Sequence, residues 1–328
     1  MPTVFTKDTL RASVEAASGG KVTVLYDDKG YPSYMNVIPK FKVEDIDASL
    51  GTGVHPAFIV GGVEKSQIFI GQYAAHVRDS RAVSLPGLDP AASLNFDQAK
   101  TYCKNKGQGW HLMTNWEWAA IALWSLKNGF QPRGNTAYGK SHEAGYETAL
   151  RQDRGIPGDT AGTARNLTGS GPASWRHDNT YTGIADLVGN VWEWNDGLKI
   201  VDGKIYMPAD NNYALDESQW NNTGIVVDAS GVLNTTKTGD YNSSLAWKSI
   251  TAKAGVTIPT SLKQALVAPS FDVTNPKGTF YANNTGEMMP GRGGRWNHGA
   301  AAGLFALSLD FPRSRVYTNV GFRPAYIG

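Results

Sequence analysis

The stretch RGGRWNHGAAAGLFALSLDFPRSRVYTNVGFR, from Arg292 to Arg323, combines two kinds of residue. Its RGG start, Trp296 and its VGFR end are typical of glycine turns and buried aromatic residues, which form a rigid framework. Between them, side chains such as Arg295, Asp310 and Tyr317 differ in size and charge and follow neither a helical nor a strand period. The segment therefore predicts a tight scaffold that carries an irregular set of side chains.

The composition of the 328 residues predicts a loop-rich globular protein with an aromatic core, in one large domain or two modest ones. Charged residues make up 18%, below the usual level of about 25%. The 37 glycines and ten tryptophans are many for this length. Because the net charge is only +2 and no basic block occurs, nucleic acid is a poor partner on electrostatic grounds.

The sequence predicts no cofactor or metal and no catalytic set. The one cysteine, Cys103, excludes an intrachain disulfide framework and is expected inside a helix. The six histidines lack metal-ligand spacing, and we find no calcium loop, phosphate-binding glycine loop or nucleophile elbow. Asp186 and Glu193 flank a tryptophan-rich turn, where we expect them to fix loop amides and not to act as an acid–base pair.

The N-terminus, MPTVFTKDTLRASVEAASGG, has no apolar core of a signal peptide, and no run approaches the length of a membrane span. We expect synthesis in the cytoplasm without a signal peptide and without membrane insertion. Residues 1–50 are expected to form a small separate unit. It holds a helix near 7–17 and a hairpin around Lys29–Pro32.

Residues 51–328 are expected to form an α+β domain of antiparallel sheets with two helices and long loop insertions. Two strand runs are predicted within 54–73. Capping boxes predict that one helix begins after Asn95 and another spans about 115–128. Residues 130–180 and 200–285 are expected to be irregular insertions, the second with a strand at Lys204–Met207 and a short helix near Ser261–Leu266.

These features occur in the order of a known family. VHPAFIVGGVEKSQIFIGQY (54–73), the helix pair, DLVGNVWEW (186–194) and the RGG…GFR ending resemble the C-type-lectin-fold branch that formylglycine-generating enzymes share with the variable proteins of diversity-generating retroelements. The resemblance covers about residues 41–328 and implies the C-type lectin fold of the formylglycine-generating-enzyme type. It also implies that Trp192 and Trp194 lie in the core.

The two branches differ in chemistry. Formylglycine-generating enzymes use a pair of cysteines late in the fold, and this chain has no cysteine after Cys103. In the variable proteins, randomised Asn codons that keep their terminal pyrimidine cannot yield Lys, Glu, Gln, Met or Trp. Between Arg292 and Arg323 the first four are absent, where the chain's average frequency gives about four. The resemblance therefore favours the variable proteins.

We interpret the chain as a non-enzymatic ligand-binding protein with a segment, about 292–323, that is diversified by a retroelement. The expected frame of that segment is Gly293, Gly294, Trp296, Phe305, Leu307, Leu309, Val320, Gly321 and Phe322. The expected ligand-binding residues, exposed on one face, are Arg295, Asn297, His298, Ala301, Ser308, Asp310, Phe311, Arg315, Tyr317 and Asn319.

The expected partner is a protein or glycan on a cell surface, recognised by a phage tail or a surface adhesin. Residues 1–50 would attach the domain to the particle or join it to another copy. Two alternatives remain open: a diverged enzyme of the formylglycine-generating type, and a structural virion or surface protein whose C-terminal face is merely solvated.

Overall fold

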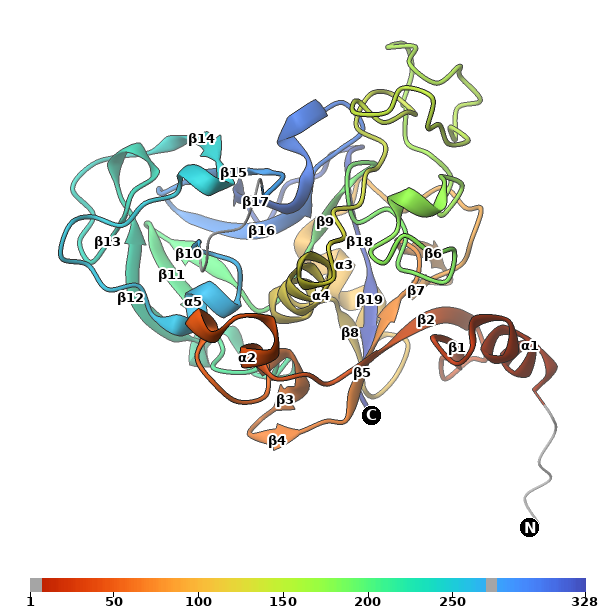
Figure 1. Cartoon of the computed structure of the whole chain (residues 1–328), viewed down its shortest axis with the longest axis horizontal. Helices are drawn as coiled ribbons and strands as arrows, with labels where there is room; N and C mark the ends of the chain where they lie inside the picture. The colour runs from red at the N-terminus through yellow and green to blue at the C-terminus, as the bar shows by residue number, and fades with distance from the viewer. Residues whose placement is uncertain (1–7, 270–275) are drawn as a thin grey trace.

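The structure, a computed structural model, describes residues 8–269 and 276–328. It is an α+β fold in which strands dominate, as predicted, and helix α4 crosses the middle of the molecule (Figure 1). The α-helices in these ranges are α1 (Thr9–Ser18), α2 (Val43–Ile46), α3 (Phe96–Lys104), α4 (Asn115–Lys127) and α5 (Thr260–Gln264).

One sheet joins the two ends of the chain. Its strands, in spatial order, are β1 (Val22–Tyr26), β2 (Pro32–Pro39), β5 (Gln67–Gly71), β19 (Pro324–Tyr326) and β8 (Trp110–Leu112), all antiparallel. The predicted hairpin is confirmed, with Val22 opposite Asn36. Because β2 pairs with β5, this hairpin continues the sheet of the main body. Strand β19 lies between β5 and β8, and this pairing holds the residues that follow the 292–323 segment in place.

The second sheet carries most of the C-terminal segment. Its main path runs β13 (Leu233–Asn234), β12 (Asn221–Val227), β11 (Lys204–Met207), β10 (Lys199–Val201), β16 (Glu287–Gly293), β17 (Gly303–Phe311), β15 (Thr279–Asn283) and β14 (Asn242–Ala246). Beside β16, β9 (Trp192–Trp194) pairs with β18 (Val320–Phe322) in parallel. Two small hairpins complete the strands, β3 (Ile59–Val60) with β4 (Val63–Glu64), and β6 (His76–Arg78) with β7 (Arg81–Val83).

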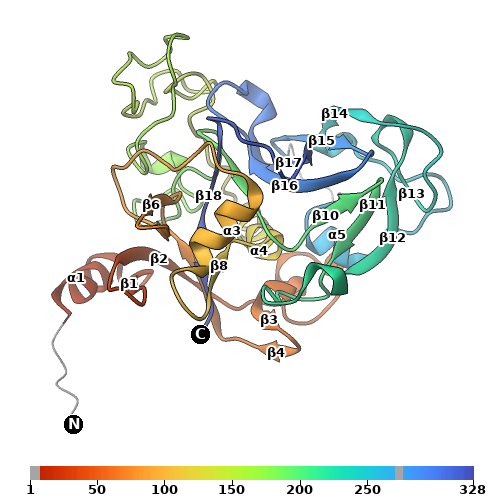
Figure 2. The ribbon, with the colours of Figure 1, turned by 180° about the vertical axis from the view of Figure 1, so that it is seen from behind.

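Both predicted capping boxes are present. The side chain of Asn95 accepts a hydrogen bond from the Gln98 amide at the start of α3, and Thr114 accepts one from the Glu117 amide at the start of α4. Such reciprocal bonds satisfy amides that the first helical turn leaves free. Helix α3 lies against β8 (Figure 2), and α4 is buried along most of its length. Helix α4 thus fills the centre of the fold.

The tryptophans that follow the Gly189–Asn190 turn lie in the core, as predicted. Trp192 and Trp194 are 3% and 0% exposed. The Trp194 ring packs edge-to-face against Phe96 at 5.9 Å and Phe311 at 5.4 Å between ring centroids. Burying two indoles contributes several kcal/mol to folding. This cluster anchors β9 beneath the C-terminal strands.

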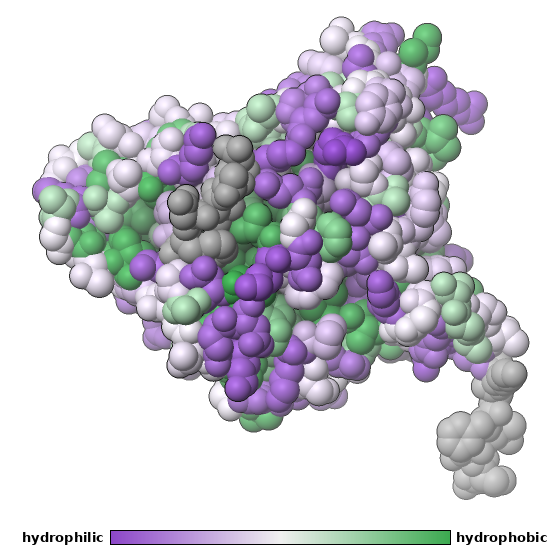
Figure 3. All heavy atoms as spheres, in the orientation of Figure 1, coloured by the Kyte–Doolittle hydropathy of each residue, from purple (hydrophilic) through white to green (hydrophobic). Residues whose placement is uncertain are grey.

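The predicted long loop at 130–180 is confirmed. Every residue in it is described, and it contains no α-helix and no named strand. It is held by its own contacts, since the buried Arg151 guanidinium donates to Asp153 and to the carbonyls of Asp159 and Ala161. The loop projects from the body at the upper right of Figure 1, and apolar residues lie at its outer edge (Figure 3).

Residues 200–285 are more regular than expected. The predicted strand at Lys204–Met207 is β11, and the predicted short helix is α5. The rest, however, also supplies β12, β13, β14 and β15 to the large sheet, so the expectation of an irregular insertion is wrong here. In the described residues, no helix combines the length and apolar character that crossing a membrane requires.

Candidate ligand-binding site

The expected frame of the C-terminal segment is buried throughout. Gly293 and Gly294, where β16 ends, have φ of +88° and +91°, which L side chains rarely adopt. A Cβ on Gly294 would lie 2.6 Å from the Cβ of Ala302. The turn therefore requires glycine, and it directs the chain from β16 to the short 3-10 helix at Gly299–Ala301.

The arginines at the two ends of the segment are structural. Arg292 is fully buried and donates two hydrogen bonds to Asn115 Oδ1, at 2.6 and 3.0 Å. It also donates to the backbone carbonyls of Ala265 and Leu266, which follow α5. Arg323 donates to the two Glu193 carboxylate oxygens at 2.5 and 2.9 Å. Burial lowers the pKa of Arg292 to about 9 and raises the pKa of Glu193. These side chains fasten both ends of the segment to the core.

Asp186 fixes the loop before β9 in the way the sequence predicts, whereas Glu193 binds an arginine side chain and not a loop amide. Asp186 accepts hydrogen bonds from the Gly169 amide at 2.7 Å and from Asn166 Nδ2 at 3.2 Å. With Glu193 bound to Arg323, both acidic residues of this turn hold backbone and side chains in place.

Above this frame lies a hollow of about 130 Å³, which we call the C-terminal hollow. Three separate parts of the 292–323 segment meet there: the turn after Gly294, the end of β17, and the loop that follows it. The residues that line it are Trp192, Tyr281, Arg295, His298, Asp310, Phe311 and Arg315.

Aromatic rings form its floor and walls. Trp192 meets Phe311, His298 and Tyr281 edge-to-face, with ring centroids 5.6, 5.3 and 5.9 Å apart. Tyr281 in turn stacks on His298 at 5.9 Å. The rings pack against one another and support the hollow from the core, since Trp192 and Phe311 are almost fully buried.

Charged groups surround these rings. The Arg315 guanidinium carbon lies 3.9 Å from the Phe311 ring centroid and 4.4 Å from that of Tyr317, so two aromatic faces hold it. Asp310 accepts a hydrogen bond from the Ser308 hydroxyl. Burial, and then the charges of Arg295 and Arg315, lower the pKa of His298 to about 4, so its imidazole is neutral at pH 7.

The structure brings five of the ten expected ligand-binding residues into this hollow: Arg295, His298, Asp310, Phe311 and Arg315. Tyr317, 53% exposed, adjoins it through Arg315. Asn297 is exposed, Ala301 is half-buried on the 3-10 helix beside His298, and Asn319 is half-buried with its carbonyl bound to the Trp192 amide.

The expected exposure is wrong for two residues. Ser308 is 0% and Phe311 2% exposed. Both lie on β17, which is flanked by β16 and β15 and is buried on both faces, so alternate residues do not point to solvent. Phe311 is buried but still lines the hollow, and the Ser308 hydroxyl donates a hydrogen bond to the Asp310 carboxylate.

Two lining residues were not among the expected ligand-binding residues. Trp192 was expected in the core only, and Tyr281 lies on β15, inside a region that we expected to be irregular. The parallel pairing that places Tyr281 opposite Ser308 joins strands distant in sequence. No local pattern predicts this pairing.

The loop at 130–180 supports the turn that carries Arg295 and His298. The Tyr138 amide donates to the Trp296 carbonyl at 2.7 Å, and the Gly299 amide donates to the Thr136 carbonyl at 2.9 Å. In Figure 1 this turn, near the top of the molecule, lies beside the loop. The loop thus acts as a rigid support for one wall of the hollow.

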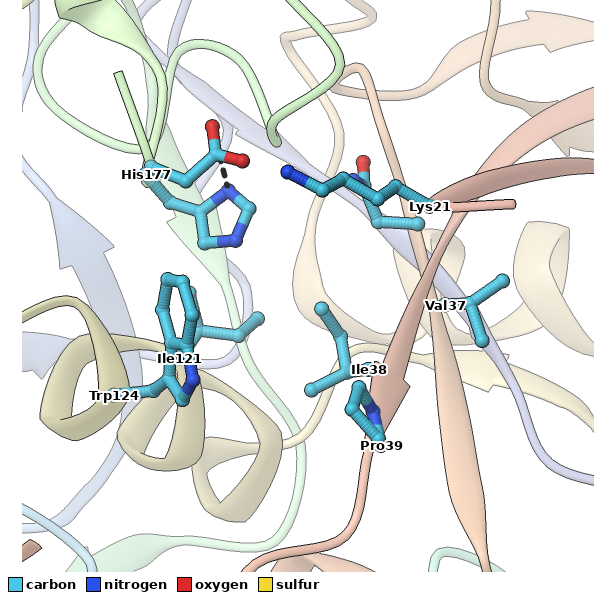
Figure 4. A pocket seen from close by; sticks show the side chains of 9 residues that line it. Lys21, Val37, Ile38, Pro39, Ile121, Trp124 and His177 are labelled. Atoms are coloured by element: carbon cyan, nitrogen blue, oxygen red, sulfur yellow. Dashed lines mark ion pairs between the residues drawn. The ribbon is translucent and has the colours of Figure 1, made fainter. Parts of the chain in front are cut away.

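A second cavity, of about 220 Å³, lies between β2 and α4 (Figure 4). Ile38, Pro39, Ile121 and Trp124 form its apolar walls, and His177 points into it. His177 Nδ1 accepts from the Ile184 amide at 2.8 Å and lies 4.0 Å from the Asp178 carboxylate, too far for a hydrogen bond. The pair is therefore not arranged as an acid–base dyad.

Cys103 lies fully buried in α3, where burial raises the pKa of its thiol. A protonated, inaccessible thiol is a poor nucleophile. Within residues 8–269 and 276–328, no group of three His, Cys, Asp or Glu side chains is placed to hold a metal ion.

The solved structures that the chain resembles include two variable or tropism-determining proteins. The chain resembles Treponema denticola variable protein 1, with 14% identity, a TM-score of 0.37, and coverage of 93% of this chain and 98% of that chain. It also resembles a Major Tropism Determinant U1 variant, with 12% identity, a TM-score of 0.34, and coverage of 93% and 71%. No family model and no curated protein matches the sequence. At these identities and scores, neither likeness by itself establishes a shared fold or function.

Proposed function

We propose that the chain is a non-enzymatic binding protein with a C-type lectin fold of the formylglycine-generating-enzyme type, and that its C-terminal hollow binds a macromolecule on a cell surface. One observation carries the proposal. Side chains from three separate parts of the 292–323 segment converge on one hollow, while the frame residues of the segment are buried. A rigid frame with unlike side chains around a hollow is the design of a binding surface.

The residue types around the hollow support a diversified segment. Each of the ten expected ligand-binding positions in 292–323 holds a residue type that a randomised Asn codon yields. Lys, Glu, Gln and Met are absent from the whole segment. In this proposal a retroelement supplies the variation, and residues 1–50 attach the domain to a phage tail or a cell surface, or to another copy. A reverse transcriptase gene and a near-copy of the 292–323 codons beside the gene would support the source of variation.

Binding can be tested with labelled protein and a panel of whole bacterial cells from the habitat of the source organism. The wild type should bind a subset of them, and Arg315→Ala together with Tyr317→Ala should abolish that binding without unfolding the protein. Arg78→Ala is the matched control, because Arg78 is an exposed guanidinium 4.6 Å from the Tyr31 ring and does not line the hollow. Equal binding by all three proteins would refute a binding role for the hollow.

A further inference from the structure

The arginines of the C-terminal segment fall into two groups by their partners. Arg292 binds amide and carbonyl oxygens, Arg313 binds Asp97, Glu217 and Glu287, and Arg323 binds Glu193. Arg295 and Arg315, which both line the hollow, form no ion pair with any carboxylate in the described parts of the chain. The two guanidiniums in the hollow therefore share one nearby carboxylate, that of Asp310, and neither forms an ion pair with it.

Three nitrogen atoms of the lining side chains, Arg295 Nε, Arg315 Nε and His298 Nδ1, are buried and lack a hydrogen-bond partner among the described residues. Such unpaired buried donors cost free energy and show that the surrounding protein does not neutralise these side chains. The terminal guanidinium nitrogens of Arg295 and Arg315 are not buried in this way, and a ligand that offers oxygen atoms to them would supply the partners that the protein does not. The planar fork of an arginine matches a carboxylate better than it matches a neutral acceptor.

The net charge of the lining residues favours an anion. Two guanidinium groups face one carboxylate, that of Asp310, while the imidazole of His298 is neutral. One negative charge on a ligand would therefore balance the hollow. The low exposure of the aromatic floor strengthens this attraction, because a charge pair in a partly dry site is weakly screened.

Asp310 and the rings narrow the class of anion. The Asp310 carboxylate accepts hydrogen bonds only, so it is matched by a ligand with hydroxyl groups near its own acid group. The side chain of an acidic peptide has no such donors and would place a second carboxylate against Asp310. A sugar ring also has an apolar C–H face, which fits against the half-buried ring of Tyr281.

The size of the hollow limits how much of a ligand it holds. Its volume of about 130 Å³ leaves room for one small group of a ligand. The neighbouring sugars of a chain would extend out of the hollow.

We propose that the C-terminal hollow binds a carboxylate-bearing sugar residue of a surface polysaccharide, with Arg295 and Arg315 on its carboxylate and Asp310 on its hydroxyl groups. This proposal rests on the proposed function, because it names the ligand class of the same hollow. It makes Arg295, Asp310 and Arg315 the residues that determine specificity in this variant of the segment.

The test measures the quenching of tryptophan fluorescence, since Trp192 forms the floor. The probes are a glucuronic-acid-containing oligosaccharide, its neutral glucose counterpart and a glutamate-rich peptide. The wild type should bind the acidic oligosaccharide at least tenfold more tightly than either other probe. Arg295→Gln and Arg315→Gln should each weaken that binding at least tenfold, and Arg78→Gln should leave it unchanged.

The variant Asp310→Asn distinguishes a sugar ligand from an acidic ligand that has no hydroxyl groups. It should weaken binding of the acidic oligosaccharide, because the hydroxyl groups lose a charged acceptor, and strengthen binding of the glutamate-rich peptide. Equal affinity for the acidic and neutral oligosaccharides would overturn the acidic ligand. Tighter binding of the peptide would overturn the sugar.

The whole-cell assay distinguishes failure of this inference from failure of the proposed function. If Arg315→Gln loses cell binding while no acidic oligosaccharide binds, the hollow is a binding site for another ligand and the sugar proposal is wrong. If Arg315→Gln also leaves cell binding unchanged, both proposals are wrong.

Discussion

At the scale of single residues, the chemistry of their partners separates the arginines that hold the fold from those that we propose for ligand binding. Arg323 and Arg292 are fully buried and have several oxygen partners each, whereas Arg315 lies between two aromatic rings with its Nε unpartnered. The sequence predicts this division at both ends of the segment, because the arginines there adjoin glycines and aromatic residues of the frame. It does not predict which carboxylate or carbonyl each one binds.

Arg323→Met should destabilise the protein by about 3–5 kcal/mol, because it leaves the Glu193 carboxylate buried without its partner. Urea unfolding followed by tryptophan fluorescence measures the change. Adding Glu193→Gln should restore part of the stability. Lys29→Ala is the control, since the Lys29–Asp79 pair is half exposed and should barely affect the midpoint. A stable Arg323→Met protein would contradict the anchoring role.

Two aromatic residues of the candidate site should behave differently on truncation. Phe311→Ala should cost about 3–5 kcal/mol, because Phe311 packs against Trp192 and Trp194. Tyr317→Ala should change stability by less than about 0.5 kcal/mol, because about half of the residue is in solvent and its ring packs only on the Arg315 guanidinium at the surface. Thermal melts of the two variants give the comparison. Equal losses of stability would show that the placement of one of the rings is wrong.

At the scale of elements, local chemistry is what the sequence predicts well. The starts of α3 and α4 depend on residues three apart, and the predicted hairpin depends on one turn, so neighbouring residues determine them. Strand β17 differs, because its burial on both faces results from pairing with β16 and β15. For this reason the exposure of Ser308 and Phe311 could not be predicted from alternation.

The two capping boxes predict an order of stability. Thr114→Ala should cost near 2 kcal/mol, the upper end of the usual range of about 0.5–2 kcal/mol, because Thr114 Oγ1 also bonds to the buried Asn211 Oδ1 at 2.7 Å. Asn95→Ala, at the more exposed start of α3, should cost about 1 kcal/mol. Chemical unfolding of both variants tests the order, and a larger loss for Asn95→Ala would contradict it.

At the scale of the whole molecule, three histidines make stability depend on pH. Burial is the largest cause that lowers the pKa of His55, His177 and His298 to about 4, below the value of about 6.5 in an unfolded chain. Between these values the unfolded chain takes up protons that the folded chain does not. Stability should therefore fall as the pH is lowered from about 6.5 towards 4.

Unfolding free energies at pH 7 and pH 5 measure this effect. His298→Gln should show a smaller decrease than the wild type, and a substitution at the exposed Asn297 should keep the full decrease. A free energy that stays constant between the two pH values would show that these imidazoles are not buried in their neutral form.

The same scale limits what the sequence can predict about the site. Through the family resemblance, the order of the motifs predicts that the C-terminal segment carries the binding residues. The hollow itself depends on Tyr281 and on the support of the 130–180 loop, and both depend on contacts between distant segments. Sequence patterns therefore predict the segment, but they do not predict the residues from other segments that complete the hollow.

The central claim is that the C-terminal segment separates binding from folding. It is tested most directly by a triple variant, Arg295→Ala, Arg315→Ala and Tyr317→Ala, assayed for both its melting temperature and its binding to the cells that the wild type recognises. The account predicts a melting temperature within about 3 °C of the wild type and a loss of binding, because arginine and aromatic contacts dominate binding surfaces. A cooperatively folded triple variant that binds those cells as the wild type does, or one that unfolds, would contradict it.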